Sequence, residues 1–440
     1  MKVVVIGGNA AGMSFAAKYK RNKPSDDVVV IEKRDHISFG ACGLPYFVAG
    51  MFDDTERMIS RTPEQAIASG LDVHVNTEML SVNRVKKQIL VRKQNSEQVL
   101  DYDMLIIATG ARPVIPDFGE YRSEFVYTLT SQADGLAVKK ALGDNNKQRI
   151  AVIGGGFIGL EVFDAAHGLG KHVTIIEREE HIMSQQFSPD MIKVVEEAIR
   201  DSGADLKTNT SVLAIRDSEQ DGYIIDTDRG QVDADIVILA LGFIPNTELF
   251  DLPKAANGAL LADEFGMTED PHIYAVGDCA VVHHLTLEHS VYIPLATTAN
   301  KQARMMADKL AGKETHMLGF LGSSSLKVLD YELARTGISE RMANMYNMDV
   351  SVSTIVDKNQ TDYYPGQEDI ALKLIYQPES HELLGGEIIG KKGAVNRINA
   401  LAVAISAKLT TEQLGYVDFA YAPPFSRTWD ALNVAGNVAK

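Results

Sequence analysis

The sequence predicts an α/β protein with two Rossmann-like units and a C-terminal α+β domain. Residues 2–34 and 149–179 share one plan, in which an apolar strand, a glycine turn, a helix and a second apolar strand lead to a glutamate. Residues 101–113 and 233–246 share another, a buried strand that runs into glycine and proline. From residue 322 onward, apolar and polar residues alternate as they do in antiparallel strands.

The composition is that of an ordinary globular protein. The 440 residues are 45% hydrophobic and 23% charged, and this length allows two or three domains. A formal net charge of −16 argues against binding to nucleic acid or to an anionic membrane surface. The chain shows no apolar run of about 18 residues that could span a bilayer and no signal-peptide pattern at its start. We therefore expect a cytoplasmic enzyme without a nucleic-acid partner, a membrane anchor or a metal site.

The second repeat carries a complete dinucleotide-binding signature. Gly154, Gly156 and Gly159 form a GxGxxG motif, and Glu177 follows at the end of the next strand. The glycines permit a tight turn, close approach of the backbone to a pyrophosphate and close packing of helix on strand. The glutamate can accept hydrogen bonds from ribose hydroxyls. This pattern predicts a bound dinucleotide.

The first repeat carries a weaker version of the same signature. Gly7 and Gly12 are in place, but Asn9 replaces the middle glycine. Glu32 again supplies the acid at the end of the second strand. Two units with correctly placed acids rarely arise from glycine turns alone, so we expect a second nucleotide here.

Residues 266–280 complete the pattern with a strand that leads to Gly277 and Asp278, where a carboxylate can accept hydrogen bonds from sugar-alcohol hydroxyls. Together, these segments resemble the two-dinucleotide-binding flavoprotein disulfide reductases over essentially the whole chain. The resemblance implies that the first unit and the Asp278 segment hold FAD and that the second unit holds NADH or NADPH.

The resemblance assigns cofactor contacts to individual positions. The expected FAD contacts are Gly7, Gly12, Glu32 and Asp278. The expected nicotinamide-nucleotide contacts are Gly154, Gly156, Gly159 and Glu177. Further expected cofactor contacts are Gly8, Ala11, Lys33, Thr109, Gly110, Phe157, Ile158, Gly242, Gly277, Ala296 and Thr297.

The resemblance also implies how the domains are arranged. The FAD-binding domain would comprise residues 1–115 and 247–320, with the NAD(P)H-binding domain, residues 116–246, inserted between them. Residues 322–440 would form a dimerisation domain, so the expected assembly is a homodimer. Within it, residues 394–414 carry apolar positions at helical spacing and predict helical structure.

The sequence contains two cysteines, and one of them lies in the glycine-framed segment SFGACGLPY, residues 38–46. Ordinary flavoprotein disulfide reductases pair two cysteines with four residues between them. The positions at that spacing from Cys42 hold Ile37 and Phe47. Cys279 follows the flavin-binding segment and is expected to be a small buried packing residue. Cys42 would therefore act as a single thiol or as half of a transient bond.

A single cysteine beside a flavin can receive two electrons only after its oxidation to a sulfenic acid or to a mixed disulfide. The segment around Cys42 is similar to the active-site segment of NADH peroxidases, water-forming NADH oxidases and coenzyme A disulfide reductases. The peroxidases and oxidases have a histidine where this chain has Ala10, so the usual hydrogen-bond donor to a sulfenate is missing. A helix start after Cys42 would favour its thiolate. The alternative is an inert, buried cysteine.

Two tyrosine-bearing segments, residues 361–366 and 418–430, resemble coenzyme A disulfide reductases. A phenol from the partner subunit could hydrogen-bond the departing thiolate, which makes Tyr421 a catalytic candidate, together with Tyr363 and Tyr364. Tyrosines at an interface can also do no more than pack.

The resemblance places the substrate contacts at Ser14, Arg21, Ser38 and Asn300. The basic run that includes Arg21 could bind the phosphates of coenzyme A or be a solvated helix face. The chain departs from the coenzyme A disulfide reductases at Ala41, where they have asparagine, and at Lys18, where they have glutamine. These departures leave the details of substrate contact open.

The favoured function is NAD(P)H-dependent reduction of coenzyme A disulfide to two coenzyme A thiols through a Cys42–S–S–CoA mixed disulfide. Coenzyme A persulfides could serve as substrates by the same chemistry. The alternative enzyme is an NADH oxidase or peroxidase that reduces oxygen or peroxide through a Cys42 sulfenate. A non-catalytic flavoprotein that changes partners on reduction is a third possibility. Glu177 would favour NADH over NADPH, although the neighbouring Arg178 could attract a 2′-phosphate.

Overall fold

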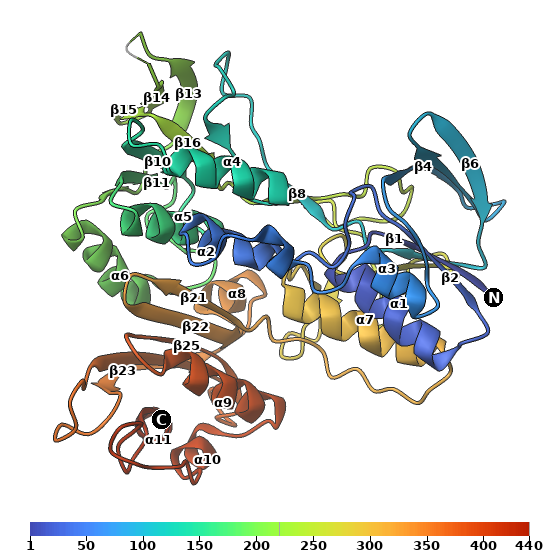
Figure 1. Ribbon diagram of the computed structural model, residues 1–440. Coiled ribbons are helices and arrows are strands. Elements are labelled where there is room, and N and C mark those ends of the chain that lie inside the picture. The colour runs from blue at the N-terminus through green and yellow to red at the C-terminus, as the bar shows by residue number, and fades with distance from the viewer. Residues whose placement is uncertain (220, 440) are drawn as a thin grey trace.

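The computed structural model describes residues 1–219 and 221–439 and confirms the predicted fold class (Figure 1). Within these residues, two five-stranded parallel sheets and one five-stranded antiparallel sheet each form the centre of a lobe. No helix in the described part of the chain combines the length and the apolarity that crossing a membrane requires.

The first parallel sheet is built from segments that are far apart in the sequence. Its strands, in spatial order, are β18 (Ile273–Ala275), β7 (Met104–Ile107), β1 (Lys2–Ile6), β2 (Asp27–Ile31) and β3 (Asp72–His74). The central strands are continuous runs of buried Val and Ile, as parallel strands that are covered on both faces require. Because β18 comes from beyond the second sheet, the second unit is inserted in the chain of the first.

Two layers cover this first sheet. Helices α1 (Ala10–Asn22) and α7 (Ala296–Leu310) pack against each other on one face (Figure 1). The other face packs on the antiparallel strands β4 (Thr77–Asn83), β5 (Gln88–Lys93) and β6 (Ser96–Asp101). Shorter elements of the same lobe are α3 (Pro63–Ala68), β19 (Val282–His283) and β20 (Ser290–Val291).

The second parallel sheet repeats this plan. Its strands, in spatial order, are β12 (Asp205–Lys207), β11 (His172–Ile176), β10 (Arg149–Ile153), β16 (Ile236–Leu239) and β9 (Val126–Tyr127). One face packs on α4 (Gln132–Leu142), α5 (Phe157–Gly168) and α6 (Pro189–Asp201). The other packs on β13 (Val212–Asp217), β14 (Tyr223–Thr227) and β15 (Gly230–Ala234). The ribbon of β8 (Ala111–Pro113) and β17 (Phe243–Pro245) carries the chain into and out of this unit.

The third sheet is antiparallel. Its strands, in spatial order, are β21 (Ser324–Val328), β22 (Tyr331–Gly337), β25 (Leu383–Gly390), β24 (Asp369–Tyr376) and β23 (Ser351–Lys358). Helices α9 (Ala394–Ser406) and α11 (Ala431–Val438) pack on it through one hydrophobic cluster, and α8 (Glu340–Met345) follows β22.

The helical pattern over residues 394–414 does not form a single helix. Helix α9 ends at Ser406, and α10 (Thr411–Gly415) begins after a break. Lys408 adopts a φ of 55°, and Thr410 and Gln413 form a capping box that starts the new helix. The prediction missed the break because apolar periodicity continues across it.

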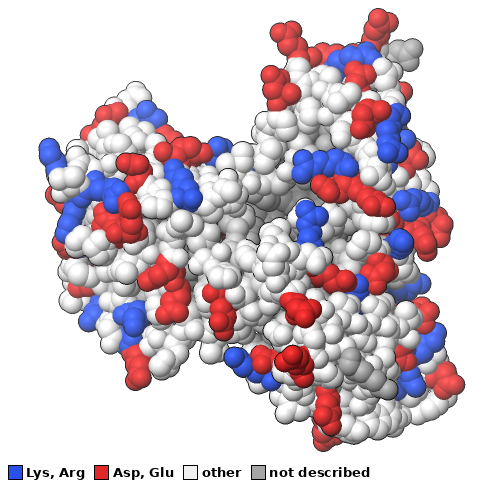
Figure 2. Space-filling model, turned by 180° about the vertical axis from the view of Figure 1, so that it is seen from behind, with Lys and Arg blue, Asp and Glu red and all other residues white. Residues whose placement is uncertain are grey.

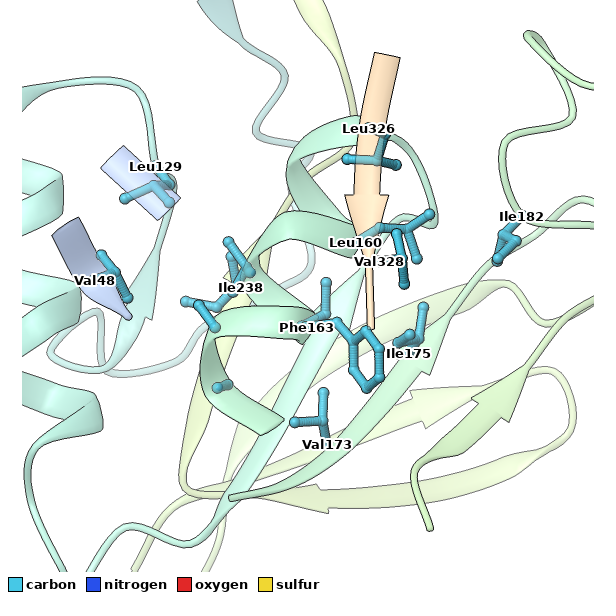
Figure 3. Close-up of a cluster of buried hydrophobic side chains, with 14 of the residues drawn as sticks. Val48, Leu129, Leu160, Phe163, Val173, Ile175, Ile182, Ile238, Leu326 and Val328 are labelled. Atoms are coloured by element: carbon cyan, nitrogen blue, oxygen red, sulfur yellow. The ribbon is translucent and has the colours of Figure 1, made fainter. Parts of the chain in front are cut away.

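Helix α5 is held between the second and third sheets. Its side chains Leu160 and Phe163 are fully buried. Figure 3 shows them among Ile175 of β11 and Leu326 and Val328 of β21, in one continuous hydrophobic cluster. The helix therefore fixes how the third sheet is seated on the second unit.

Phe163→Ala should lower the free energy of unfolding by about 3–5 kcal/mol, because the buried ring leaves a cavity between two sheets. The shift in the urea midpoint measures this effect. Leu169→Ala, just beyond the same helix, is the control, because that side chain is 44% exposed and should change stability by less than about 0.5 kcal/mol. Equal effects of the two substitutions would contradict the central packing role of Phe163.

Candidate functional site

A cleft of about 2480 Å³ lies where the three lobes meet, and Figure 2 shows the surface hollowed between them. Its walls include both glycine turns, Cys42, Asp278 and residues 321–325 at the start of the third sheet. The two Rossmann-like units and the third sheet therefore share one cavity.

The first glycine turn brings helix α1 closer to the sheet than side chains would allow. Gly7 has a φ of 108°, and a Cβ there would lie 2.1 Å from the carbonyl oxygen of Ala108. A Cβ on Gly12 would lie 1.9 Å from the carbonyl oxygen of Gly7. Only glycine fits both positions, and this contact places the start of α1 at the wall of the cleft.

Glu32 follows β2 and binds back to this turn. Its Oε2 accepts a hydrogen bond from the Gly8 N–H at 2.7 Å, and its Oε1 accepts one from the Arg34 N–H at 2.9 Å. Glu32 also lines the cleft, as Lys33 does. Since each carboxylate oxygen has a further lone pair, Glu32 can still accept a hydrogen bond from a ribose hydroxyl.

The second glycine turn has the same construction. Gly154 has a φ of 110°, and a Cβ there would lie 2.3 Å from the carbonyl oxygen of Ala240. A Cβ on Gly159 would lie 1.9 Å from the carbonyl oxygen of Gly154. The Oε2 of Glu177 accepts a hydrogen bond from the Gly155 N–H at 2.7 Å. The chain thus builds two equivalent nucleotide cradles that open onto one cleft.

Most of the predicted cofactor contacts line this cleft. They are Gly7, Ala11, Glu32, Lys33, Thr109, Gly110, Gly154, Gly156, Phe157, Ile158, Glu177, Gly242, Gly277, Asp278, Ala296 and Thr297. The other three, Gly8, Gly12 and Gly159, do not form its wall. The first donates its N–H to Glu32, and the other two permit the close packing of helix on strand.

Asp278 supplies the test of whether FAD fits the site. Burial raises the pKa of its carboxyl to about 6, yet the carboxyl oxygens accept no hydrogen bond from any described residue, and only the backbone carbonyl accepts one, from the Tyr292 hydroxyl. It faces the cleft beside Gly277, which adopts a φ of 80°. A desolvated carboxyl that lacks a donor needs a hydroxyl or N–H from a ligand. The hydroxyl-rich ribityl chain of FAD meets that need.

Cys42 lies in a single 3₁₀ turn, Ala41–Gly43, directly ahead of α2 (Leu44–Val48), and is exposed to the cleft. The expectation that a helix start favours its thiolate is not met by the chain alone. Surrounding protein atoms desolvate the thiol and raise its pKa, and the Glu161 and Asp278 carboxylates raise it further. Thiolate formation at Cys42 therefore depends on what binds beside it.

The predicted substrate residues line the same cleft as this thiol. Ser14 and Arg21 on α1, Ser38 ahead of Cys42 and Asn300 on α7 all line the same cleft. The hydroxyl of Ser14 donates a hydrogen bond to Oδ1 of Asn300. Two hydroxyls, an amide and a guanidinium thus line the same cavity as the exposed thiol.

The three predicted tyrosines lie elsewhere, on the surface of the third lobe. The hydroxyls of Tyr363 and Tyr421 are 2.8 Å apart, and this hydrogen bond raises the pKa of Tyr421. Neither of them lines the cleft of its own chain, nor does Tyr364. All three are exposed, as are the neighbouring Phe425 and Trp429. This exposed aromatic surface is where a partner subunit could bind.

The sequence interpretation missed Glu161. This residue lies on α5, two positions after the last glycine of the second turn, and lines the cleft. Burial raises the pKa of its carboxyl to about 7, with a further contribution from Asp164. An acid inside an otherwise apolar helix start, GFIGLEVF, is the signal that could have revealed it.

Cys279 is fully buried, as expected for a packing residue. Its Sγ lies 3.4 Å from the carbonyl oxygens of Ile107 and Val276. Among the described residues, no group of three or more His, Cys, Asp or Glu side chains could hold a metal ion.

Comparisons with known proteins agree with this architecture. Residues 1–303 match the family model of the pyridine nucleotide-disulphide oxidoreductases, and residues 323–432 match the dimerisation domain of that family. The chain is 35% identical to an NAD(P)H sulfur oxidoreductase (CoA-dependent) of Pyrococcus abyssi, over 100% of this chain and 98% of the relative. It is 30% identical to an NADH oxidase of Enterococcus faecalis, over 100% and 99%.

A solved structure is equally similar. The NAD-dependent persulfide reductase from A. fulgidus matches with a TM-score of 0.94 and 32% identity, over 100% of this chain and 83% of that one. A family match that spans both Rossmann-like units, together with whole-length relatives of 30% identity or more, shows the family of this chain. The chain belongs to the pyridine nucleotide-disulphide oxidoreductase family and is an oxidoreductase.

Proposed function

We propose that this protein is an FAD-dependent NAD(P)H:coenzyme A disulfide reductase that acts as a homodimer. The observation that carries the proposal is the solitary Cys42 thiol, which opens onto the same cleft as Ser14, Arg21 and Asn300. Cys279 is buried elsewhere and gives Cys42 no internal disulfide partner. In a mixed-disulfide mechanism, the sulfur that pairs with Cys42 must then come from the substrate.

The two glycine turns would hold the two cofactors. The first turn, Glu32 and Asp278 fit FAD, and the second turn and Glu177 fit the nicotinamide nucleotide. Bound there, FAD would take hydride from the nicotinamide and deliver two electrons to an oxidised Cys42. The FAD-binding domain would comprise residues 1–115 and 247–320, the NAD(P)H-binding domain residues 116–246 and the dimerisation domain residues 322–440.

Cys42 would alternate between a thiolate and a mixed disulfide. The thiolate attacks one sulfur of coenzyme A disulfide, forms the Cys42–S–S–CoA bond and releases one coenzyme A thiolate. Reduction by two electrons then breaks the new bond and releases the second coenzyme A. Ser14, Arg21, Ser38 and Asn300 would hold the coenzyme A that is bound to Cys42. Each turnover consumes NAD(P)H and a proton and yields two coenzyme A thiols.

Tyr421 of the partner subunit would hydrogen-bond the thiolate that leaves during this attack. Its exposed position and its hydrogen bond to Tyr363 support that role, because the pair presents hydroxyls on a surface that a second subunit can cover. The match to the family's dimerisation domain supports the homodimer.

The second candidate is an NADH oxidase that works through a Cys42 sulfenate, and the E. faecalis relative supports it. Ala10 weakens it, because this cleft residue offers the sulfenate no hydrogen bond from its methyl side chain. The CoA-dependent sulfur oxidoreductase of P. abyssi favours coenzyme A chemistry. NADH consumption measured with and without coenzyme A disulfide, in air and under argon, separates the two candidates. NADH consumption that requires oxygen and does not respond to coenzyme A disulfide would overturn the main proposal.

NADH should be preferred over NADPH. Glu177 and Arg178 both line the cleft, where the Glu177 carboxylate would repel a 2′-phosphate and Arg178 pairs with Glu179 at 3.4 Å. Glu177→Gln keeps an oxygen acceptor for the Gly155 N–H. It should raise the ratio of kcat/KM for NADPH to that for NADH roughly 10-fold, the effect of about 1.4 kcal/mol of charge repulsion. A higher kcat/KM for NADPH in the unmodified enzyme would contradict the assignment.

The resting oxidised enzyme should carry coenzyme A on Cys42. Under non-reducing conditions, the mass of the intact protein should exceed that of the chain by one coenzyme A, and dithiothreitol should remove the excess. Cys42→Ser should retain FAD and hydride transfer but lose coenzyme A disulfide reduction, because serine forms no disulfide. A mass increase of one oxygen atom, removable by NADH, would instead place the enzyme in the peroxidase and oxidase branch.

Tyr421→Phe should slow coenzyme A disulfide turnover by roughly 10²-fold, while flavin reduction by NADH stays near normal, because only the leaving thiolate loses its hydrogen bond. Stopped-flow absorbance separates the two half-reactions. Tyr416→Phe is the matched control, since that exposed ring packs edge-on against Trp429 outside the Tyr363–Tyr421 pair. Equal losses in both half-reactions would indicate that Tyr421 only packs.

A further inference from the structure

Glu161 lies between two cavities. It lines the main cleft together with Cys42, and it also lines a second cavity of about 770 Å³. Pro45 and Tyr46 line both cavities as well. The wall between the cavities is therefore formed by α2 and α5, which lie side by side in Figure 1.

The helix geometry holds Glu161 in this wall. Leu160 and Phe163 anchor α5 in the hydrophobic cluster. One turn after Glu161, Asp164 accepts a hydrogen bond from the Leu329 N–H at 2.8 Å and thereby ties the helix to the third lobe. The Glu161 carboxyl itself forms no hydrogen bond or ion pair with any described residue. It is therefore free to exchange a proton with either cavity.

The surroundings of Glu161 set its protonation. Burial and then Asp164 raise the pKa of its carboxyl to about 7, so it holds a proton below neutral pH and loses it above. Burial raises the pKa of Cys42 and of Tyr46, and the Glu161 carboxylate raises both further. The charged and titratable groups that line the second cavity with Glu161 are Tyr46, Asp164, His167, Asp201, Lys327, Asp330, Tyr331 and Lys391, and Cys42 and Asp278 line the main cleft with it.

The proposed reaction needs a proton at this place. Reduction of Cys42–S–S–CoA by two electrons yields two sulfur anions, of which the Cys42 thiolate must stay unprotonated to attack the next disulfide. The coenzyme A sulfur takes a proton, and a bound nicotinamide nucleotide and coenzyme A would restrict entry from the main cleft. The second cavity offers a separate route from solvent to the wall beside Cys42.

We propose that Glu161 is a proton-transfer residue that carries a solvent proton from the second cavity to the coenzyme A sulfur released from Cys42. The protonated carboxyl gives its proton as the S–S bond breaks, and the resulting carboxylate regains a proton from the second cavity. The inference rests on the proposed function for the identity of the sulfur. Reduction of a Cys42 sulfenate by two electrons to thiolate and water would take up two protons at the same place.

The test compares Glu161→Gln with Asp164→Asn in the FAD-loaded enzyme. Coenzyme A disulfide turnover should fall in the wild type as the pH rises through about 7. Glu161→Gln should be roughly 10²-fold slower at acid pH and should lose this inflection. Asp164→Asn keeps an oxygen acceptor for the Leu329 N–H, so it should retain the maximal rate and move the inflection to lower pH. Glu161→Gln at the wild-type rate, or with the inflection preserved, would overturn the proposal.

A second measurement needs no substrate and separates this proposal from the proposed function. The rate at which iodoacetamide alkylates reduced Cys42, followed by mass, reports the thiolate fraction at each pH. Glu161→Gln should move this profile to lower pH because it removes the carboxylate that raises the pKa of Cys42. If the pH profile of alkylation is the same in Glu161→Gln and in the wild type, the coupling between Glu161 and Cys42 is wrong. If the pH profile of alkylation moves but the enzyme does not reduce coenzyme A disulfide, the coupling between Glu161 and Cys42 stands and only the proposed substrate is wrong.

Discussion

The structure depends on two close backbone contacts, in each of which a carbonyl oxygen occupies the space that a side chain on a glycine would need. At Gly12 and at Gly159, a Cβ would lie 1.9 Å from the carbonyl oxygen of the first glycine of the same turn. Real Cβ atoms do not approach an oxygen that closely, so the helix can pack against its strand only if both residues are glycine. This contact sets where each helix begins and leaves its first turn at the wall of the cleft.

The two turns face one cavity because helix α5 connects three parts of the molecule. It packs on the second sheet, on β21 of the third sheet and beside α2, which follows Cys42. The hydrophobic contacts of Leu160 and Phe163 supply most of this attachment. As a result, the thiol, the second nucleotide turn and the third lobe keep fixed positions around the cleft.

The charges near Cys42 are mainly acidic. Asp278 and Glu161 both have raised carboxyl pKa values because burial removes water from them, and both raise the pKa of the thiol. A protein that needs a thiolate would place a cation there if the chain acted alone. This arrangement makes sense for an enzyme whose bound cofactor and substrate complete the electrostatic environment of its cysteine.

The sequence by itself determined the two Rossmann-like units, the acids that follow them and the isolation of Cys42, because these features depend on residues close together in the chain. Only the tertiary structure decided that Glu161 lines the same cleft as Cys42, that the thiol pKa is raised and that Gly8, Gly12 and Gly159 lie behind the cleft wall. It also divided the predicted helical segment 394–414 through the cap at Thr410. The reason is physical: desolvation and charge coupling arise only when distant segments pack together, whereas a turn or a periodic strand is specified by its neighbours.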